Sequence, residues 1–312
     1  MVILFTFLII TFVIFVIAML YILKAKEVTN EEITDKIILK IAVPKENEKT
    51  PLSAEQMFAS LHGIIEGTSK AKDPISFEIA GNKDGILFYV VIPKYLRDFV
   101  TGQIYAQYPL SEIHESQDYF DDVYKYNSVY ITNIKLEKKY SLPIKTFENF
   151  DVDPLSALTA TMTNINGECA IQFVIRPIGN TWQEGSKKYV EKLKGKNFGF
   201  TEMIKSQNPE KTNKKEETSF TNEEKVKQIE NKILKVGYQI VIRVMAATEQ
   251  ESESRRVVNE IKASFKQFST PHLNSFIEVS NNDKKSHEKN FTYFKMILSV
   301  ISSFVTSFAF NI

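Results

Sequence analysis

The residue types that most often perform chemistry in proteins, histidine and cysteine, are few in this sequence and stand far apart. The chain of 312 residues has four His and one Cys. Metal sites need ligands at paired, short spacings, and His62, His114, His272 and His287 show none. We expect His62 to end a helix and His114 to lie in an edge strand, as packing or surface residues. Cys169 begins an apolar strand, so we interpret it as a small buried hydrophobe rather than a nucleophile.

Nucleotide-binding and hydrolase motifs are also missing from the sequence. The nearest approach to a phosphate-binding loop is GNTWQEGSKK from Gly179, where the spacing is wrong and Ser precedes Lys. Gly185 in this stretch reads better as part of the first turns of a helix. The motifs G-x-G-x-x-G, H-E-x-x-H and G-x-S-x-G do not occur. We therefore expect no catalytic residues, no cofactor and no metal, and a protein that is not an enzyme.

An acidic and aromatic segment, DYFDDVYKY, is the remaining cluster of potential ligands. It contains Asp118, Asp121 and Asp122 among four aromatic residues. Carboxylates at this spacing could hold a cation, and a metal site is the alternative interpretation. We favour a connection between two domains that packs by its rings.

Two other sets of side chains are candidates for contacts with partners. Tyr105, Gln107 and Tyr108 fall where a helix ends and an edge strand begins; they form either a contact site for a neighbouring subunit or substrate, or helix-end packing. Lys187, Lys188 and Lys192 belong to a lysine-rich segment, with 13 Lys against nine Glu between Trp182 and Lys235. This segment either touches nucleic acid or acidic headgroups, or is a solvated antiparallel helix pair.

The elements that must position these residues follow one order twice. Residues 37–116 read as β-α-β-β-α-β, the ferredoxin-like order, with helices at Ser53 to Glu66 and Lys94 to Tyr108. Ser53 is the expected N-cap of the first helix. After a linker, 117–128, residues 129–280 repeat the order with helices at Pro154 to Ile165 and Glu251 to Phe268. The predicted fold class is therefore α+β.

The repeat is visible in the letters as well as in the order. PLSA opens a helix at Pro51 and again at Pro154, and GILFYVVI at Gly85 corresponds to GYQIVIRV at Gly237. The unequal offsets require an insertion between the second and third strands of the second domain. We place it at 182–235, as a helix, a polar linker from Gln207 to Thr221, and a second helix from Asn222 to Lys235.

A membrane segment is expected before these domains. Val2 to Leu23 has no charged residue, and at about 1.5 Å per residue it is long enough to cross a bilayer. We predict a transmembrane helix at 1–23, a stalk at 24–36 and, from the lysines that follow, a single-pass protein of the cell membrane with its bulk in the cytoplasm. The tail, 281–312, is either a truncation point, a packed helix or a second membrane segment.

Composition excludes several classes of protein. One cysteine excludes a disulfide scaffold and a Cys-rich zinc site. With 43% hydrophobic and 25% charged residues the chain can bury a core, so it is not disordered. A formal net charge of +1 gives no overall bias toward nucleic acid.

Three stretches carry a resemblance to a known family. VPKENEKTPLSAEQMFASLHGI (Val43 to Ile64), ISFEIAGNKDGILFYVVIPKYLRDFVTGQIYAQYPLSEIHE (Ile75 to Glu115) and PLSALTATMTNINGECAIQFVIRPI (Pro154 to Ile178) resemble the region that precedes the motor in conjugative-transfer-type ATPases of candidate-phyla bacteria. Those proteins are similar to type IV secretion coupling proteins. The motif GQIYAQYP is the most distinctive part. The resemblance implies a membrane anchor and an accessory α+β region ahead of a hexameric DNA-pumping ATPase.

The chain departs from that family because the phosphate loop and the rest of the motor are missing, so ATP hydrolysis is not carried over. The expected function is a non-catalytic, membrane-tethered assembly or scaffold module of a DNA translocation motor. Its expected partners are the lipid bilayer, a P-loop ATPase domain or subunit, and further copies of itself. The alternative is a membrane-anchored nucleic-acid-binding module that uses a sheet face or the lysine-rich insertion.

Overall fold

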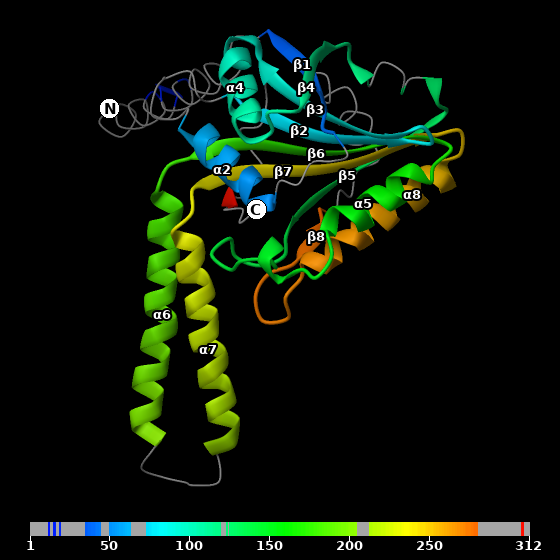
Figure 1. Ribbon diagram of the computed structural model, residues 1–312. Coiled ribbons are helices and arrows are strands. Elements are labelled where there is room, and N and C mark those ends of the chain that lie inside the picture. The colour runs from blue at the N-terminus through cyan, green and yellow to red at the C-terminus, as the bar shows by residue number, and fades with distance from the viewer. Residues whose placement is uncertain are drawn as a thin grey trace, which may run out of the picture.

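The described strands form a continuous antiparallel sheet, which six helices accompany (Figure 1). This computed structural model describes residues 12, 15, 16, 19, 35–44, 50–63, 73–119, 123, 125–204, 212–279 and 307–308. The strand order is β4-β1-β3-β2-β6-β7-β5-β8, and the two-residue strand β9 (Ser307–Phe308) pairs with β7. The predicted class, α+β, is confirmed.

The first half of the chain supplies one edge of this sheet. Its strands alternate apolar and polar residues or run apolar throughout, and its helices repeat apolar residues every three or four positions. Its elements are β1 (Lys36–Ala42), α2 (Pro51–His62), β2 (Ile75–Asn82), β3 (Gly85–Pro93), α4 (Arg97–Gln107) and β4 (Glu112–Ser116).

The second half supplies the other edge and carries the insertion. Its elements are β5 (Ser128–Leu136), α5 (Pro154–Thr163), β6 (Gly167–Ile178), α6 (Thr181–Ile204), α7 (Thr212–Ile233), β7 (Gly237–Thr248), α8 (Glu251–Ser264) and β8 (Phe276–Glu278). The two halves share one strand order. When the four strands of each half are numbered along the chain, they lie side by side in the order 4-1-3-2, counted from the edge of the sheet to the junction. The halves join where β2 pairs with β6.

One face of the sheet carries the helices and the main core. Inward residues from α2, α4, α5 and α8 belong to a single buried cluster with the strands, including Leu61, Val100, Met162 and Val257. The helix α2 also reaches across the junction of the halves. The Tyr238 hydroxyl of β7 donates to the Phe58 carbonyl, and His62 Nε2 lies 2.9 Å from the Ile178 carbonyl oxygen. The two halves are therefore packed as one body.

The other face is covered in part by the segment that joins β4 to β5. Successive residues of a strand point to opposite faces of the sheet. Val244 and Ala246 of β7 point into the main core, so Met245 and Ala247 point to the other face. Val123 of the joining segment is fully buried against Met245 and Ala247. Of the aromatic residues of this segment that the structure describes, Tyr119 and Tyr126 pack against this cluster, in agreement with the packing expected for the acidic and aromatic segment.

A long helical arm replaces a hairpin turn in the second half. In the first half, Lys83 and Asp84 separate β2 from β3; in the second half, α6 and α7 stand between β6 and β7. Figure 1 shows these two helices leaving the end of the sheet side by side. We call this pair of helices the arm. It occurs at the position predicted for the insertion.

Several predicted boundaries need correction. The helix α2 begins at Pro51 with Thr50 as N-cap, not at Ser53, because proline is favourable at a first helical position. A 3-10 turn, Lys94–Leu96, precedes α4, so that helix does not start at Lys94. The polar linker expected at Gln207 to Thr221 is shorter, since α7 already begins at Thr212.

The apolar strand β3 is exposed near its start. Leu87 and Phe88 are each 37% exposed. The neighbouring strand β1 pairs with β3 only from Phe88 to Pro93, so Gly85 to Leu87 extend beyond it.

The predicted transmembrane helix lies largely outside the described residues. Where the structure does describe this segment, Phe12, Phe15, Val16 and Met19 are helical and exposed. Within the parts of the chain that the structure describes, no helix is both long and apolar enough to cross a membrane. Most of the stalk at 24–36 and of the tail at 281–312 also lies outside the described residues.

Candidate functional site

The predicted contact residues Tyr105, Gln107 and Tyr108 close α4 and lead into the edge strand β4. Gln107 ends the helix, and the Tyr108 N–H donates to the Ile104 carbonyl at 2.7 Å. Ser111 then donates its hydroxyl to the Tyr108 carbonyl at 2.7 Å, which fixes the turn. Tyr108 is half-buried against the main core, and burial raises the pKa of its hydroxyl. Tyr105, by contrast, is 43% exposed.

Tyr105 is one of four exposed apolar side chains on and beside α4. Tyr95 is 47% exposed, Phe99 39% and Leu110 72%. Single exposed apolar residues are normal, but several that follow closely along the chain are more typical of a segment that contacts a partner. We call these four residues, Tyr95, Phe99, Tyr105 and Leu110, the α4 surface.

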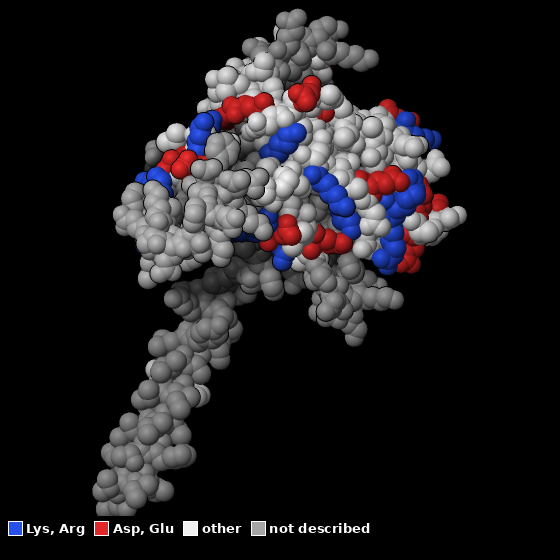
Figure 2. All heavy atoms as spheres, turned by 90° about the horizontal axis from the view of Figure 1, so that it is seen from below, with Lys and Arg blue, Asp and Glu red and all other residues white. Residues whose placement is uncertain are grey.

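The predicted lysines Lys187, Lys188 and Lys192 are exposed on α6, and acidic residues stand among them. Glu184 and Glu191 are exposed on the same turns of the helix. Farther along, Lys194 forms an ion pair of 2.8 Å with Glu230 of α7. On the face that Figure 2 shows, Lys and Arg side chains are likewise interspersed with Asp and Glu. The lysines of this stretch therefore form no continuous basic strip.

The root of the arm is fixed by a buried polar and apolar junction. Lys232 of α7 is 2% exposed and donates to the Tyr140 carbonyl at 2.8 Å. Burial of the ammonium group lowers the pKa of Lys232 to about 7. Ser186 of α6 donates to Ser141 at 3.1 Å, and Val190 and Ile229 pack in a cluster with Leu142. The arm is thus docked on the loop that follows β5.

Asn274 holds that loop in shape. Its side chain is fully buried, and its amide donates to the carbonyls of Lys139 and Leu142, each at 3.0 Å. Its oxygen accepts from the Lys138 N–H at 2.8 Å. Sequence reasoning missed Asn274 and Lys232, because no pattern separates Lys232 from the other lysines of the insertion.

A row of polar residues crosses the middle of the sheet on the face of the joining segment. Glu78 lies opposite Gln172, Gln172 opposite Arg243, and Arg243 opposite Asn133, across β2, β6, β7 and β5. Buried polar groups are expected to have hydrogen-bond partners, and a glutamate within the apolar strand ISFEIAGN was the signal in the sequence. The row ties the two halves together at their junction.

Glu78 also fastens the joining segment to the sheet. Its carboxylate is 4% exposed and accepts hydrogen bonds from Ser76, at 2.5 Å, and from the Tyr119 hydroxyl. Burial raises the pKa of Glu78, and burial together with the Glu78 charge raises the pKa of Tyr119 well above its ordinary value. The Tyr119 ring stacks on Tyr89 with centroids 4.5 Å apart.

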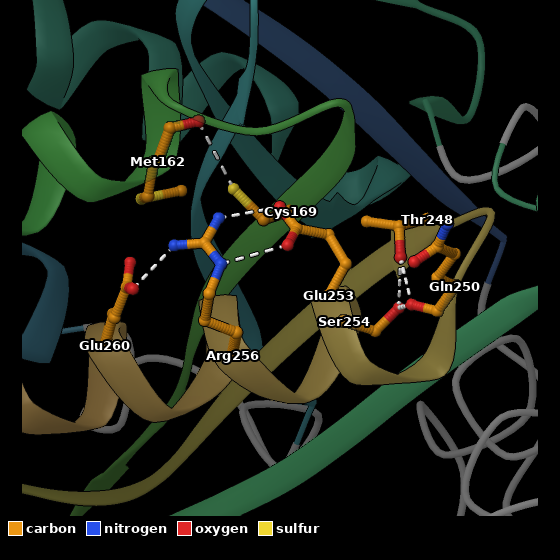
Figure 3. Close-up of polar contacts among 8 residues, drawn as sticks. All are labelled: Met162, Cys169, Thr248, Gln250, Glu253, Ser254, Arg256 and Glu260. Carbon is orange, nitrogen blue, oxygen red and sulfur yellow. Dashed lines mark hydrogen bonds and ion pairs between the residues drawn. The ribbon is translucent and has the colours of Figure 1, made fainter.

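Cys169 is buried as the sequence predicted. It is 1% exposed and its Sγ lies 3.3 Å from the Gly81 carbonyl and 3.5 Å from that of Met162, the contact drawn in Figure 3. Burial raises the pKa of the thiol to about 12. A thiol in this state is a poor nucleophile at neutral pH.

The other polar contacts in Figure 3 stabilise α8. Arg256 lies between Glu253 and Glu260 on the same helix, and Ser254 is 2.7 Å from the Thr248 hydroxyl. Among the described residues, no group of three or more His, Cys, Asp or Glu could hold a metal ion. His114 is exposed on the edge strand, as expected.

Comparisons with known proteins give one family. A family profile described as "Domain of unknown function (DUF8128)" matches residues 18–297. A search of curated proteins gave no match. Among solved structures, a chitooligosaccharide oxidase is similar at 9% identity and a TM-score of 0.35, over 85% of this chain and 52% of the oxidase. The chain therefore spans about half of that protein, and a TM-score this low supports no argument.

Proposed function

This chain belongs to the DUF8128 family, and we propose that it is a non-catalytic assembly module tethered to the cell membrane. Its partner in this proposal is a P-loop ATPase of a conjugative, type IV secretion-like DNA translocation motor. The nature of that partner rests on the sequence resemblance described above. The body of the module consists of two ferredoxin-like units joined through β2 and β6, and it works by protein contacts.

The observation that carries the proposal is the α4 surface. It offers two tyrosines, a phenylalanine and a leucine, and aromatic residues are enriched at protein interfaces. The helix below it is anchored by Val100 and Ile104 in the main core, so the surface is presented on a fixed element. A fixed apolar surface loses little conformational entropy on binding.

The exposed apolar residues of the first segment support the tether. Phe12, Phe15, Val16 and Met19 are helical and each is more than one third exposed. Side chains of this kind are stable in contact with lipid and unfavourable in water. In the proposal this segment enters the membrane and the sheet stays outside it.

The tether is tested by washing vesicles that contain the full chain with alkaline carbonate. A chain that spans the membrane stays in the pellet. Release of the intact chain into the supernatant would show that the proposed tether is wrong.

The contact is tested by co-expressing the full chain with a coupling-protein-type P-loop ATPase from the same genome. Phe99→Lys should reduce co-purification of the ATPase at least about tenfold, as expected for loss of an interface anchor. The matched control is Leu234→Lys, because Leu234 is 83% exposed at the end of α7, outside the α4 surface. Equal loss in both variants, or no loss in Phe99→Lys, would contradict the proposal. Lysines interspersed with glutamates on α6 give no reason to propose nucleic-acid binding as a second function.

A further inference from the structure

One edge of β7 lacks a full-length neighbour, because β5 turns away from it toward β8 (Figure 1). The strand β7 runs for 12 residues, Gly237–Thr248, but β5 pairs only with its last seven. The last two residues of β5, Lys135 and Leu136, pair with β8 instead. From Gly237 to Val241, β7 therefore has β6 on one side, and on the other side the described residues supply only β9. We call this side of Gly237 to Val241 the open edge.

The open edge belongs to a buried part of the strand. Tyr238 is 4% exposed and Ile240 5%, and both are members of the main core. Backbone N–H and C=O groups that are buried away from water nearly always have hydrogen-bond partners in folded proteins. Water cannot easily supply these partners at Tyr238 and Ile240, so another strand is expected along the open edge.

The register of β9 on β7 agrees with the chemistry of the two faces of the sheet. Phe308 pairs with Tyr238 and Ser307 with Gln239, in antiparallel orientation. Residues that pair across neighbouring strands lie on the same face of a sheet. Tyr238 faces the main core, whereas Gln239 lies on the other face, where it accepts a hydrogen bond from Arg176 Nε at 3.1 Å. The pairing thus places the apolar Phe308 on the core face and the polar Ser307 on the polar face.

The sequence on both sides of Ser307 and Phe308 has the period of a strand. From Phe304 to Ile312 the even-numbered positions are Phe, Thr, Phe, Phe and Ile, and the odd-numbered positions are Val, Ser, Ala and Asn. Alternation of bulky apolar residues with smaller or polar ones is typical of a strand that buries one face. A strand with this pattern and with the register of Phe308 presents its bulkier set to the main core.

We propose that the open edge is a strand-addition site and that its ligand is the segment of this chain around Ser307 and Phe308. In this mode of recognition the main-chain hydrogen bonds provide affinity, and pockets for alternate side chains provide specificity. The segment then belongs to the folded body beside the root of the arm, and not to a second membrane span. The inference stands on the pairing of β7 and does not depend on the α4 surface or on the membrane tether.

The test is disulfide formation in the full chain in detergent micelles with a glutathione redox buffer. The test pair is Gln239→Cys with Ser307→Cys, since paired strand residues have Cα atoms about 4.5–5.5 Å apart, within reach of a disulfide. The matched control is Arg176→Cys with Ser307→Cys. Arg176 lies opposite Gln239 on β6 and is one strand farther, about 10 Å from Ser307, and each pair removes one partner of the same hydrogen bond. The test pair should form a disulfide within one chain at least about tenfold faster than the control.

A change at Phe308 tests the assignment of the faces. In the test pair, Phe308→Asp should slow disulfide formation at least about tenfold, because a carboxylate is unfavourable on the core face. Phe308→Leu should stay within about threefold of the test pair. Thermal unfolding checks that each variant is folded, and peptide mass spectrometry with non-reducing gels identifies the disulfide. The inference is overturned if the test pair reacts no faster than the control, if Phe308→Asp leaves the rate unchanged, or if the disulfide joins two chains, since a second copy would then supply the strand.

Discussion

Phe77 of β2 and Phe173 of β6 lie directly opposite each other where the two halves of the sheet join. On either side of them Ile75 faces Ile175 and Ile79 faces Ile171. Each strand therefore contributes Ile, Phe and Ile at alternate positions, and the two strands run in opposite directions. Phe77 and Phe173 also occupy equivalent places in their hairpins, opposite Val90 and Ile242. The two halves are thus related by an approximate two-fold axis that passes between the phenylalanines. Each half contributes its second strand to the junction, and the pairing of these strands satisfies the backbone hydrogen-bonding groups along both of their edges.

Loss of the Tyr119 hydroxyl should destabilise the junction of the joining segment with the sheet. In Tyr119→Phe the buried Glu78 carboxylate loses a donor, and we expect the free energy of unfolding to fall by about 1–3 kcal/mol in urea titrations at pH 7. Tyr105→Phe serves as the control, because Tyr105 is exposed and its replacement should change stability by less than about 0.5 kcal/mol. Equal stability of wild type and Tyr119→Phe would show that this hydrogen bond does not fasten the segment.

Lys232 should make the stability of the protein rise with pH. Its pKa is about 7 in the fold against 10.5 ordinarily, so between these values the unfolded chain binds more protons than the folded one. The contribution of Lys232 to stability is therefore largest above pH 10.5 and is lost as the pH falls toward 7. Lys232→Met removes this titration. From pH 7 to pH 9, wild type should gain about 1–3 kcal/mol more than the variant in denaturant titrations. Parallel profiles would contradict the buried environment of this ammonium group.

A methyl group at Gly237 should loosen the root of the arm. A Cβ there would come within 2.7 Å of Trp182 Cδ1, and Trp182 is only 3% exposed. We expect Gly237→Ala to lower the free energy of unfolding by about 1–3 kcal/mol. Gly102→Ala is the matched control, since Gly102 is exposed within α4 and a Cβ there meets nothing within 4 Å. That variant should be more stable than wild type by about 0.5–1 kcal/mol. Thermal unfolding of both variants distinguishes the two effects.

Cys169 should resist thiol reagents in the folded protein. Burial keeps the thiol protonated, with a pKa of about 12, and excludes the reagent. Ellman's reagent at pH 8 should label the native chain at least about a hundredfold more slowly than the urea-unfolded chain. A Glu223→Cys variant, with its thiol on the exposed side of α7, should be labelled at once at the new site. Rapid labelling of wild type would show that the strand β6 opens readily.

Periodicity predicted the local elements well because it reports on burial of one face. The order of strands and helices, the insertion site and the burial of Cys169 all follow from apolar spacing in short windows. The start of α2 was misplaced by two residues because Ser53 offers an N-cap signal while Pro51 already has the backbone angle that a first turn needs.

Contacts between distant parts of the chain could not be predicted in this way. The pairing of β2 with β6 depends on two edges matching in three dimensions, and a repeat in the sequence is equally compatible with two separate sheets. The same holds for Asn274, whose hydrogen bonds reach a loop more than 130 residues earlier in the chain. By contrast, the inward position of Tyr108 follows from its helical spacing to Val100 and Ile104; Tyr108 packs against the core, whereas Tyr105 is exposed.

The replacement of a two-residue turn by the arm separates the length of the arm from the geometry of the sheet. Both strands that flank it keep the register of the corresponding hairpin in the other half, and closing a longer loop adds only about 0.6 kcal/mol for each doubling. Whole helical turns can therefore be added or removed beyond Val190 and Ile229 without disturbing the β-strands. The arm is in this sense an adjustable spacer, whose reach from the body can evolve independently of the fold that supports it.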